Sequence, residues 1–460
     1  MKAKFSRRDF MRASILSASG AFLAACAPAT PKATDAPPSE AATEAPPEPT
    51  VSDAPPAVVP GTISMWGWWD IRMAIYEEAA QGFMQENPGV KIKVEDVAEM
   101  QRKVNAAVAA GTGPTLLKQD SDFYFNMRAQ GILIPYPEEL FPDSWFAETY
   151  PNFDLKNYGR YVVPTGSTPF VLIYNKAHFA EVGLDPEVPP TTWAELIEMG
   201  KKLTKVDASG TFTRMGYIND QYYAELPLIF QEGADIMKRE GEKRLSVFNS
   251  DEVKAAYEFH TGLALKDKIW DPTLTDNIEA FGTGNAAMTG GYTWVLGEYK
   301  ANYPDVYKDI GLAAPPTPTG KAEPVYGYRS PTLDFSVLKG HPEEYETAFK
   351  FLKYMYDQRG DIIFKLVDLM ALAPENIHVI NDPKVKGDAT LQKMIAIAKQ
   401  EHDPLQSGGD LDALMKNTRD QVILAGMSVS DACDLGHEEL QKLIDAGLFD
   451  YYIPIYDKFS

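Results

Sequence analysis

The first 60 residues most constrain what this chain can fold into, because neither of the two segments they contain can form a packed core. Residues 1–25 combine basic side chains, an apolar stretch from Ile15 to Ala25 and small residues just before Cys26. Such a stretch is too short for a permanent membrane-spanning helix but has the length of the apolar region of an export signal. We therefore expect residues 1–25 to be a signal peptide.

Two motifs refine this expectation. Ser6–Phe10 reads Ser-Arg-Arg-Asp-Phe and resembles a twin-arginine export signal, and Leu23–Cys26 reads Leu-Ala-Ala-Cys and resembles a bacterial lipobox. In a lipobox the cysteine is acylated and becomes the new N-terminus. The alternative is a chance basic and apolar start of a cytoplasmic protein, which the coincidence of charge, apolar stretch and cleavage site disfavours. The motifs predict an extracytoplasmic protein anchored to the cell membrane by lipid at Cys26.

Residues 26–60 read as a linker. They are mostly Ala, Pro, Thr, Ser and Glu, with almost no bulky apolar side chain. A segment of this kind cannot bury enough surface to offset the entropy of ordering it, and its Pro-Pro pairs favour extended polyproline II. The sequence thus predicts a tether between the anchor and a globular body that comprises residues 61–460.

The composition of the whole chain limits its partners and its redox chemistry. Hydrophobic residues make up 45% of the chain, enough for a core, and the net charge of −21 disfavours nucleic acid and anionic lipid headgroups as partners. Of the two cysteines, a lipidated Cys26 would leave Cys433 alone, so no intramolecular disulfide is expected. Cys433 lies in a helix-like stretch, 428–444, and is expected to be a small buried hydrophobic residue.

Periodicity predicts an α/β fold. Residues 62–66 alternate as a strand, 73–87 have apolar residues at helical spacing, and 91–95 alternate again. Strand, helix and strand in this order form a βαβ unit with parallel strands. Further elements continue the alternation: a helix near 101–110, strands at 115–118 and 171–174, a helix near 123–130, and helices that begin near 192, 250 and 342.

Motifs for catalysis and metal binding are absent from the sequence. The six histidines are isolated, with no His-Glu-x-x-His and no Cys-x-x-Cys, so the spacing supports no zinc site. No P-loop, Gly-x-Gly-x-x-Gly or Gly-x-Ser-x-Gly motif is present. With 65 acidic residues, a chance pair of carboxylates is expected, so such a pair carries no weight for glycoside hydrolysis.

Three segments place aromatic or polar side chains where an α/β sheet binds ligands, beyond the carboxyl ends of strands. Trp66–Asp70 follows the first strand, Gln119–Asp122 follows the third, and Phe281–Trp294 holds a short buried strand and two adjacent glycines. Aromatic faces and carboxylates there suit a sugar. The competing interpretations are a core Trp66, a helix cap within Gln119–Asp122 and a core role for Trp294.

Taken in order, the motifs of residues 61–460 resemble the family 1 extracellular solute-binding proteins of ABC importers, especially the sugar-binding ones. The resemblance rests on these segments: Trp66 with Trp68–Asp70, Asn87–Val94, Ala109–Thr115, Gly131–Leu133, Tyr174–Lys176 with Phe179 and Gly183–Leu184, Pro190–Leu196, and Phe281–Met288. Their order and spacing, more than any one of them, make the resemblance specific. Thr115 departs from the family, which usually has Asp at that position.

The resemblance implies a two-lobed α/β fold of the periplasmic-binding-protein type II, with a hinge between the lobes that lets them close on a ligand. The expected N-terminal lobe comprises residues 61–168 and 311–365. The expected C-terminal lobe, with the hinge helices, comprises residues 169–310 and 366–460.

The resemblance also implies the site. Ligand-binding side chains are expected at these positions: Trp68, Trp69, Asp70, Asp120, Asp122, Thr168, Tyr223, Trp294 and Arg329. No catalytic residue, metal or cofactor is expected. Gln119 and Thr168 stand where maltodextrin-binding relatives have an aromatic residue and a carboxylate, which argues against maltodextrin itself. Trp193, in the first turn of a helix, is expected to be structural.

The sequence therefore predicts a lipid-anchored binding protein that captures a mono- or oligosaccharide and passes it to the permease subunits of an ABC importer. It is expected to act as a monomer, without nucleic acid and without catalysis. Three alternatives stay open: a surface glycan-active enzyme, the same fold with a non-sugar solute or with ferric ion, which Tyr222–Tyr223 suggests, and a sensor rather than a transport component.

Overall fold

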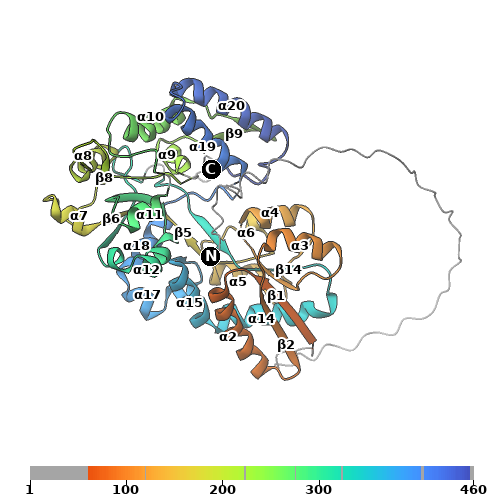
Figure 1. The fold of residues 1–460 in the computed structure, drawn as a ribbon. Helices are drawn as coiled ribbons and strands as arrows, with labels where there is room; N and C mark the ends of the chain where they lie inside the picture. The colour runs from red at the N-terminus through yellow and green to blue at the C-terminus, as the bar shows by residue number, and fades with distance from the viewer. Residues whose placement is uncertain are drawn as a thin grey trace, which may run out of the picture. The chain divides into compact units, whose positions relative to one another are not determined.

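The computed structural model describes residues 61–119, 121–221, 224–274, 276–322, 325–405 and 409–455 (Figure 1). All of them belong to one compact unit, Ala57–Ser460. The predicted signal peptide, the linker and Cys26 lie outside the described residues. Every helix in the described ranges is too short or too polar to cross a bilayer.

The first sheet contains the predicted βαβ unit. Its strand order is β2-β1-β3-β14-β4, with β2 and β3 parallel to β1 and with β14 antiparallel to both β3 and β4. The strands are β1 (Gly61–Gly67), β2 (Val90–Asp96), β3 (Leu116–Lys118), β4 (Leu133–Ile134) and β14 (Phe335–Leu338). The helices that follow its first three strands are α2 (Asp70–Glu86), α3 (Met100–Ala109) and α4 (Ser121–Ala129).

The apolar face of this sheet is buried under helices from distant parts of the chain. Ile63 and Met65 of β1 pack with Ala79 and Phe83 of α2 in one hydrophobic cluster, as the helical spacing predicts. The same cluster includes residues of two later helices, α14 (Tyr345–Gln358) and α15 (Gly360–Met370), which Figure 1 shows beside α2 and β1. The chain therefore returns to the first sheet after forming the second sheet.

The second sheet has the order β11-β6-β12, and all its pairs are antiparallel. Its strands are β6 (Phe170–Asn175), β11 (Met288–Tyr292) and β12 (Ile310–Ala313). Two parallel bridges, Met215 to Ala286 and Ile218 to Thr289, extend it beyond β11. Residues 311–313 were expected in the N-terminal lobe, but they pair with β6 because they continue the antiparallel strand that begins at Ile310.

A third, small sheet connects the other two. It has the order β13-β5-β15 and consists of β5 (Pro164–Thr168), β13 (Ser330–Leu333) and β15 (Ala373–Pro374). Only Pro169 separates β5 from β6, and only Asp334 separates β13 from β14. Two adjacent strands thus run from one large sheet into the other, the arrangement expected of two α/β lobes joined by a hinge.

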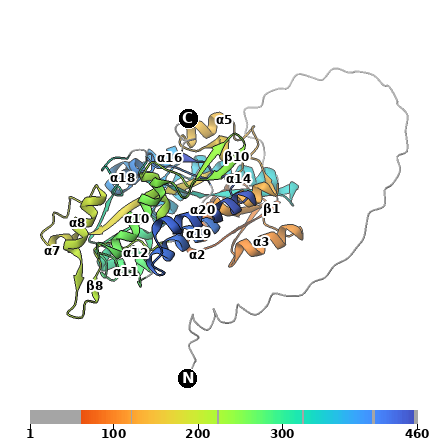
Figure 2. The same ribbon diagram turned by 90° about the horizontal axis from the view of Figure 1, so that it is seen from above.

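Several helix starts follow from local sequence. Thr192 and Glu195 form the predicted capping box of α8 (Trp193–Leu203), and Ser250 caps α10 (Asp251–Leu265). Two later helices are α12 (Val295–Asn302), which Trp294 precedes, and α20 (Val429–Asp445), in which Cys433 is fully buried as expected. Figure 2 shows α19 and α20 beside α10, and these three helices contact one another.

The remaining elements complete the two lobes. They are η1 (Pro342–Glu344), α5 (Asp143–Thr149), α6 (Leu155–Tyr158), α7 (Lys176–Glu181), β7 (Lys205–Val206), β8 (Phe212–Arg214), α9 (Glu225–Gln231), β9 (Met237–Glu240), β10 (Lys243–Ser246), α11 (Asn277–Gly282), α13 (Pro304–Tyr307), α16 (Ile377–Ile380), α17 (Pro383–Gly387), α18 (Ala389–Ala398) and α19 (Asp410–Ile423).

A buried carboxylate holds the last described segment against the second lobe. Asp235 accepts hydrogen bonds from the Tyr452 hydroxyl at 2.8 Å and from the Ile455 backbone N–H at 2.5 Å. Burial raises the pKa of Asp235 to about 7. Since the folded pKa lies above the unfolded one, the folded state binds more protons between about pH 4 and pH 7, and stability falls as the pH rises through that window.

We expect Asp235 to make the protein more stable at pH 5 than at pH 8. Each unit by which its pKa is raised corresponds to about 1.4 kcal/mol of this difference. The measurement is the free energy of urea-induced unfolding at both pH values for the wild type and for Asp235→Asn. The variant should lose this part of the pH dependence, whatever its absolute stability. An identical pH dependence in the two proteins would contradict the assignment.

Candidate functional site

The strand register brings predicted site residues of the first lobe to one edge of its sheet. β1 and β3 are parallel, so the segments after them, Trp68–Trp69 and Gln119, lie at the same edge. β14 is antiparallel to β3, and its first residue, Phe335, pairs with Lys118 there. Because β13 leads directly into β14, this edge adjoins the hinge sheet.

The second lobe has a matching edge. Tyr292, the last residue of β11, pairs with Phe170, the first residue of β6. The bridge between Ile218 and Thr289 is parallel, so the segment after Ile218 continues toward the same edge as Trp294. β5 leads directly into β6 at this edge, so it too adjoins the hinge sheet. Binding sites of α/β proteins lie at such strand ends, and this edge and that of the first lobe define the candidate site.

Trp69 presents the most exposed aromatic ring at the first edge. Its side chain is 38% exposed, and its backbone has a φ of 76°, an uncommon conformation for a residue with a side chain. Backbone strain of this kind costs of order 1–3 kcal/mol and clusters at functional sites. Trp68 is half-buried, and its ring centroid lies 4.1 Å from the Arg72 guanidinium carbon. Asp70 begins α2, but its side chain is not among those described.

Buried charged side chains lie next to this edge and hold its loop in place. Arg72 donates to the Trp68 carbonyl oxygen at 3.0 Å, and Lys118 donates to the Leu333 carbonyl oxygen. Asp334 accepts a hydrogen bond of 2.8 Å from the Tyr76 hydroxyl. Burial raises the pKa of Asp334, whereas the nearby Lys118 and Arg72 charges oppose that rise. These groups fix the position of the Trp68–Trp69 loop against the strand that enters from the hinge.

At the second edge, Trp294 is half-buried between the two hydrophobic clusters of that lobe. It precedes α12, as predicted, and follows the end of β11. Thr168 is buried in the hinge strand, and its hydroxyl donates to the Ser330 carbonyl oxygen at 3.1 Å. The hydroxyl oxygen of Thr168 keeps its capacity to accept a hydrogen bond.

Arg329 lies at the start of the second hinge strand, where it makes an ion pair with Glu375 and donates to the Asn152 carbonyl oxygen at 3.2 Å. The Ser167 hydroxyl, from β5, donates to the same Glu375 oxygen at 2.8 Å. Glu375 thereby links residues next to all three hinge strands. The sequence interpretation missed this carboxylate, because its partners lie far away along the chain.

A buried ion-pair cluster anchors the loop that follows Ile218. Arg419 of α19 lies 2.9 Å from Asp220 and 3.3 Å from Glu225, all three buried. Glu225 also lies 3.1 Å from Nδ1 of His260. Burial raises the pKa of Asp220, and the Arg419 charge opposes the rise. The cluster holds the segment that leads to Tyr223, and sequence reasoning did not identify it.

Some predicted site residues cannot be placed. Asp120 and Tyr223 lie outside the described residues, and Asp122 lies in α4 without a described side chain. Trp193 is buried as expected: its ring stacks on Phe259 with centroids 3.8 Å apart, and its indole N–H donates to Gln231. These two rings line a cavity of about 10 Å³, room for about one water molecule and too small for a sugar.

The described part of the site therefore offers aromatic rings, hydroxyl groups and backbone polar groups at strand ends of both lobes. Such a set suits a solute with both apolar ring faces and hydroxyl groups.

Comparison with known proteins agrees with this fold. The family model for bacterial extracellular solute-binding protein matches residues 67–361. Solved structures with the same fold include a solute-binding protein of Thermotoga lettingae bound with α-D-tagatose, 21% identical with a TM-score of 0.68, which covers 83% of this chain and 99% of that one. The GacH receptor of Streptomyces glaucescens, solved unliganded and with acarbose, is 20% identical with a TM-score of 0.69, over 84% of this chain and 99% of that one.

A curated relative of different specificity also matches. The sn-glycerol-3-phosphate-binding periplasmic protein UgpB of Salmonella paratyphi A is 33% identical over 138 residues, 28% of this chain and 32% of that protein. The chain thus spans about a third of the length of this relative. The fold is confirmed as the two-lobed periplasmic-binding-protein type, and the family model covers more than half of the chain. The chain belongs to the family of bacterial extracellular solute-binding proteins.

Proposed function

We propose that this protein is the lipid-anchored substrate-binding component of an ABC importer and that it captures a carbohydrate between its two lobes. The observation that carries the proposal is the placement of Trp69 and Trp294 at strand ends of different lobes, each next to the hinge sheet. A sugar ring held between such faces would bury its apolar side, while hydroxyl and backbone groups would accept and donate its hydrogen bonds.

Binding would act by shifting a population rather than by chemistry. A ligand that contacts both lobes favours the closed arrangement, and the permease then recognises that form. The proposed lobes are joined at residues 164–169 and 330–334, where β5 and β13 lead into the two large sheets. We propose no cofactor, a monomer, and attachment to the membrane through Cys26.

A second candidate ligand is a glycerophosphate. It is favoured by the match to the UgpB relative and by the likeness in fold to UgpB of Mycobacterium tuberculosis, whose structure contains glycerophosphocholine (17% identity, TM-score 0.69, over 84% of this chain and 99% of that one). Both ligand classes carry hydroxyl groups, and the phosphate group distinguishes the glycerophosphates from the sugars.

The test is a thermal-shift screen of the purified protein against mono- and oligosaccharides, polyols, glycerol 3-phosphate, glycerophosphocholine, amino acids and ferric ion. A ligand at 100 times its dissociation constant adds about 2.7 kcal/mol of stability, which shifts the melting temperature clearly. We expect a shift with a sugar and recovery of that sugar intact. A shift only with a phosphate ester would replace the ligand class, and turnover of a glycan would overturn the binding-protein function.

A further inference from the structure

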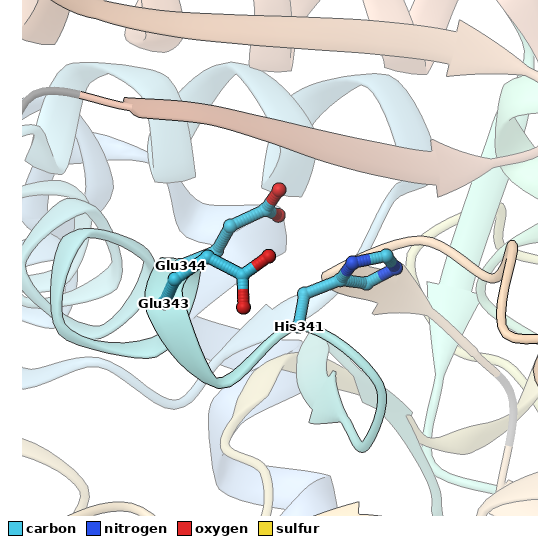
Figure 3. Close-up of side chains that lie close together, drawn as sticks. All are labelled: His341, Glu343 and Glu344. Carbon is cyan, nitrogen blue, oxygen red and sulfur yellow. The ribbon is translucent and has the colours of Figure 1, made fainter.

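Three side chains with metal-binding atoms lie together at the start of η1, in the segment that connects β14 to α14. They are His341, Glu343 and Glu344 (Figure 3), and one donor atom from each lies within 4.8 Å of the other two. The His-x-Glu-Glu spacing was not recognised in the sequence, where His341 stands apart from the other histidines. The cluster is separate from the proposed ligand site, because it follows the end of β14, whereas the site lies at its beginning.

The histidine is oriented by a partner outside the cluster. Its Nε2 lies 2.9 Å from the Gly113 carbonyl oxygen, which can only accept a hydrogen bond. Nε2 must therefore carry the proton, and Nδ1 presents its lone pair. Figure 3 shows one ring nitrogen on the side of the two carboxylates. A ligating histidine in proteins typically donates its other N–H to a carbonyl or a carboxylate in this way.

One carboxylate is oriented as well. The Thr115 hydroxyl donates to Glu344, and Thr115 is held by the Ser64 hydroxyl, which lies 3.2 Å from its backbone nitrogen. Thr115 is the residue that departs from the family pattern of Asp. An aspartate there would place a third negative charge beside Glu344, whereas threonine supplies a donor. The second carboxylate, Glu343, is exposed and can adjust to a bound ion.

We propose that His341, Glu343 and Glu344 bind a divalent transition-metal ion of the Zn²⁺ type. Bonds of about 2.0–2.2 Å in a tetrahedral site place donor atoms about 3.3–3.6 Å apart. Donors within 4.8 Å of one another would therefore have to approach by up to about 1.5 Å, which is shared between two side chains. An imidazole nitrogen favours Zn²⁺ over Ca²⁺ and Mg²⁺, which prefer oxygen donors alone. Two carboxylates balance the charge of the ion, and water would complete its coordination.

The test is calorimetric titration of the purified, metal-stripped protein with Zn²⁺, with Ca²⁺ titrated separately. The expected result is one Zn²⁺ bound per chain, with affinity reduced at least tenfold in His341→Gln and in Glu343→Gln. The matched control is His378→Gln, which removes an exposed histidine of α16 and should leave Zn²⁺ affinity unchanged.

Since Glu343 is exposed, Glu343→Gln tests the site even where His341→Gln affects folding. No Zn²⁺ binding, or equal affinity in the wild type and Glu343→Gln, would overturn the proposal. Tighter binding of Ca²⁺ than of Zn²⁺ would overturn the assigned metal class. None of these outcomes bears on the proposed solute, because the sugars and phosphate esters of the thermal-shift screen are tested without added metal.

Discussion

Arg419→Ala is expected to lower the free energy of unfolding by about 3–5 kcal/mol, the usual cost of removing one partner from a buried ion pair. The guanidinium is fully buried and lies against Asp220, Glu225 and Asp420. Without it, the two buried carboxylates Asp220 and Glu225 would keep their desolvation penalty and lose the positive charge that offsets it. Urea-induced unfolding at neutral pH measures the difference directly.

The matched control is Lys416→Ala, one turn away on α19. Lys416 also pairs with Asp420, but both side chains are substantially exposed, so its loss should cost about 1 kcal/mol or less. If both variants lost the same free energy of unfolding, burial would not be the reason why the Arg419 cluster stabilises the protein. A second readout is ligand affinity, which Arg419→Ala should weaken because Arg419 also contacts the Gln221 carbonyl oxygen, next to the segment that leads to Tyr223.

The local part of the fold could be predicted from the sequence because short-range rules determine it. The capping box of Thr192 and Glu195 depends on residues three apart. Alternation predicts a strand at 62–66, and the structure has it as Gly61–Gly67. The burial of Cys433 follows from its small apolar side chain and its place in a helix-like stretch. For such features the physical cause and the sequence signal lie within the same few residues.

The supporting charges of the site could not be predicted in this way. Arg72 and Asp334 lie beneath the same edge of the sheet, yet they are far apart in sequence. Arg419 and Asp220 are similarly separated. The chain has many acidic and basic side chains, and the crossing of β5 and β13 between the lobes decides which of them meet. The periodicity of the sequence carries no information about that crossing.

The hinge contacts suggest how the two lobes can move relative to each other. Glu375 accepts from Ser167 of β5 and pairs with Arg329 beside β13, so all three hinge segments meet at one carboxylate. The contacts of Glu375 with Ser167 and Arg329 are made at the hinge sheet rather than between the large sheets. Under the proposed function, rotation of the lobes would preserve this sheet while changing the separation of Trp69 and Trp294.

Replacing these two tryptophans should give the largest effect on function. We expect Trp69→Ala and Trp294→Ala each to weaken affinity for the solute about 10- to 100-fold, since an aromatic face that stacks on a ligand contributes on the order of 1–3 kcal/mol. Trp69 is partly exposed and Trp294 half-buried, so the fold should persist in both variants. Calorimetric titration with the solute found by the thermal-shift screen measures the dissociation constants.

Trp193→Phe is the control for these variants. Trp193 stacks on Phe259 and donates to Gln231 and to the Pro316 carbonyl oxygen, so its replacement should reduce stability by about 1–3 kcal/mol and leave affinity nearly unchanged. If the solute contacts both lobes at once, the double variant should bind more weakly than either single variant. Unchanged affinity in both Trp69→Ala and Trp294→Ala would mean that the solute binds elsewhere. A solute bound at these two strand ends would contact at least one of the two rings, and its affinity would then fall.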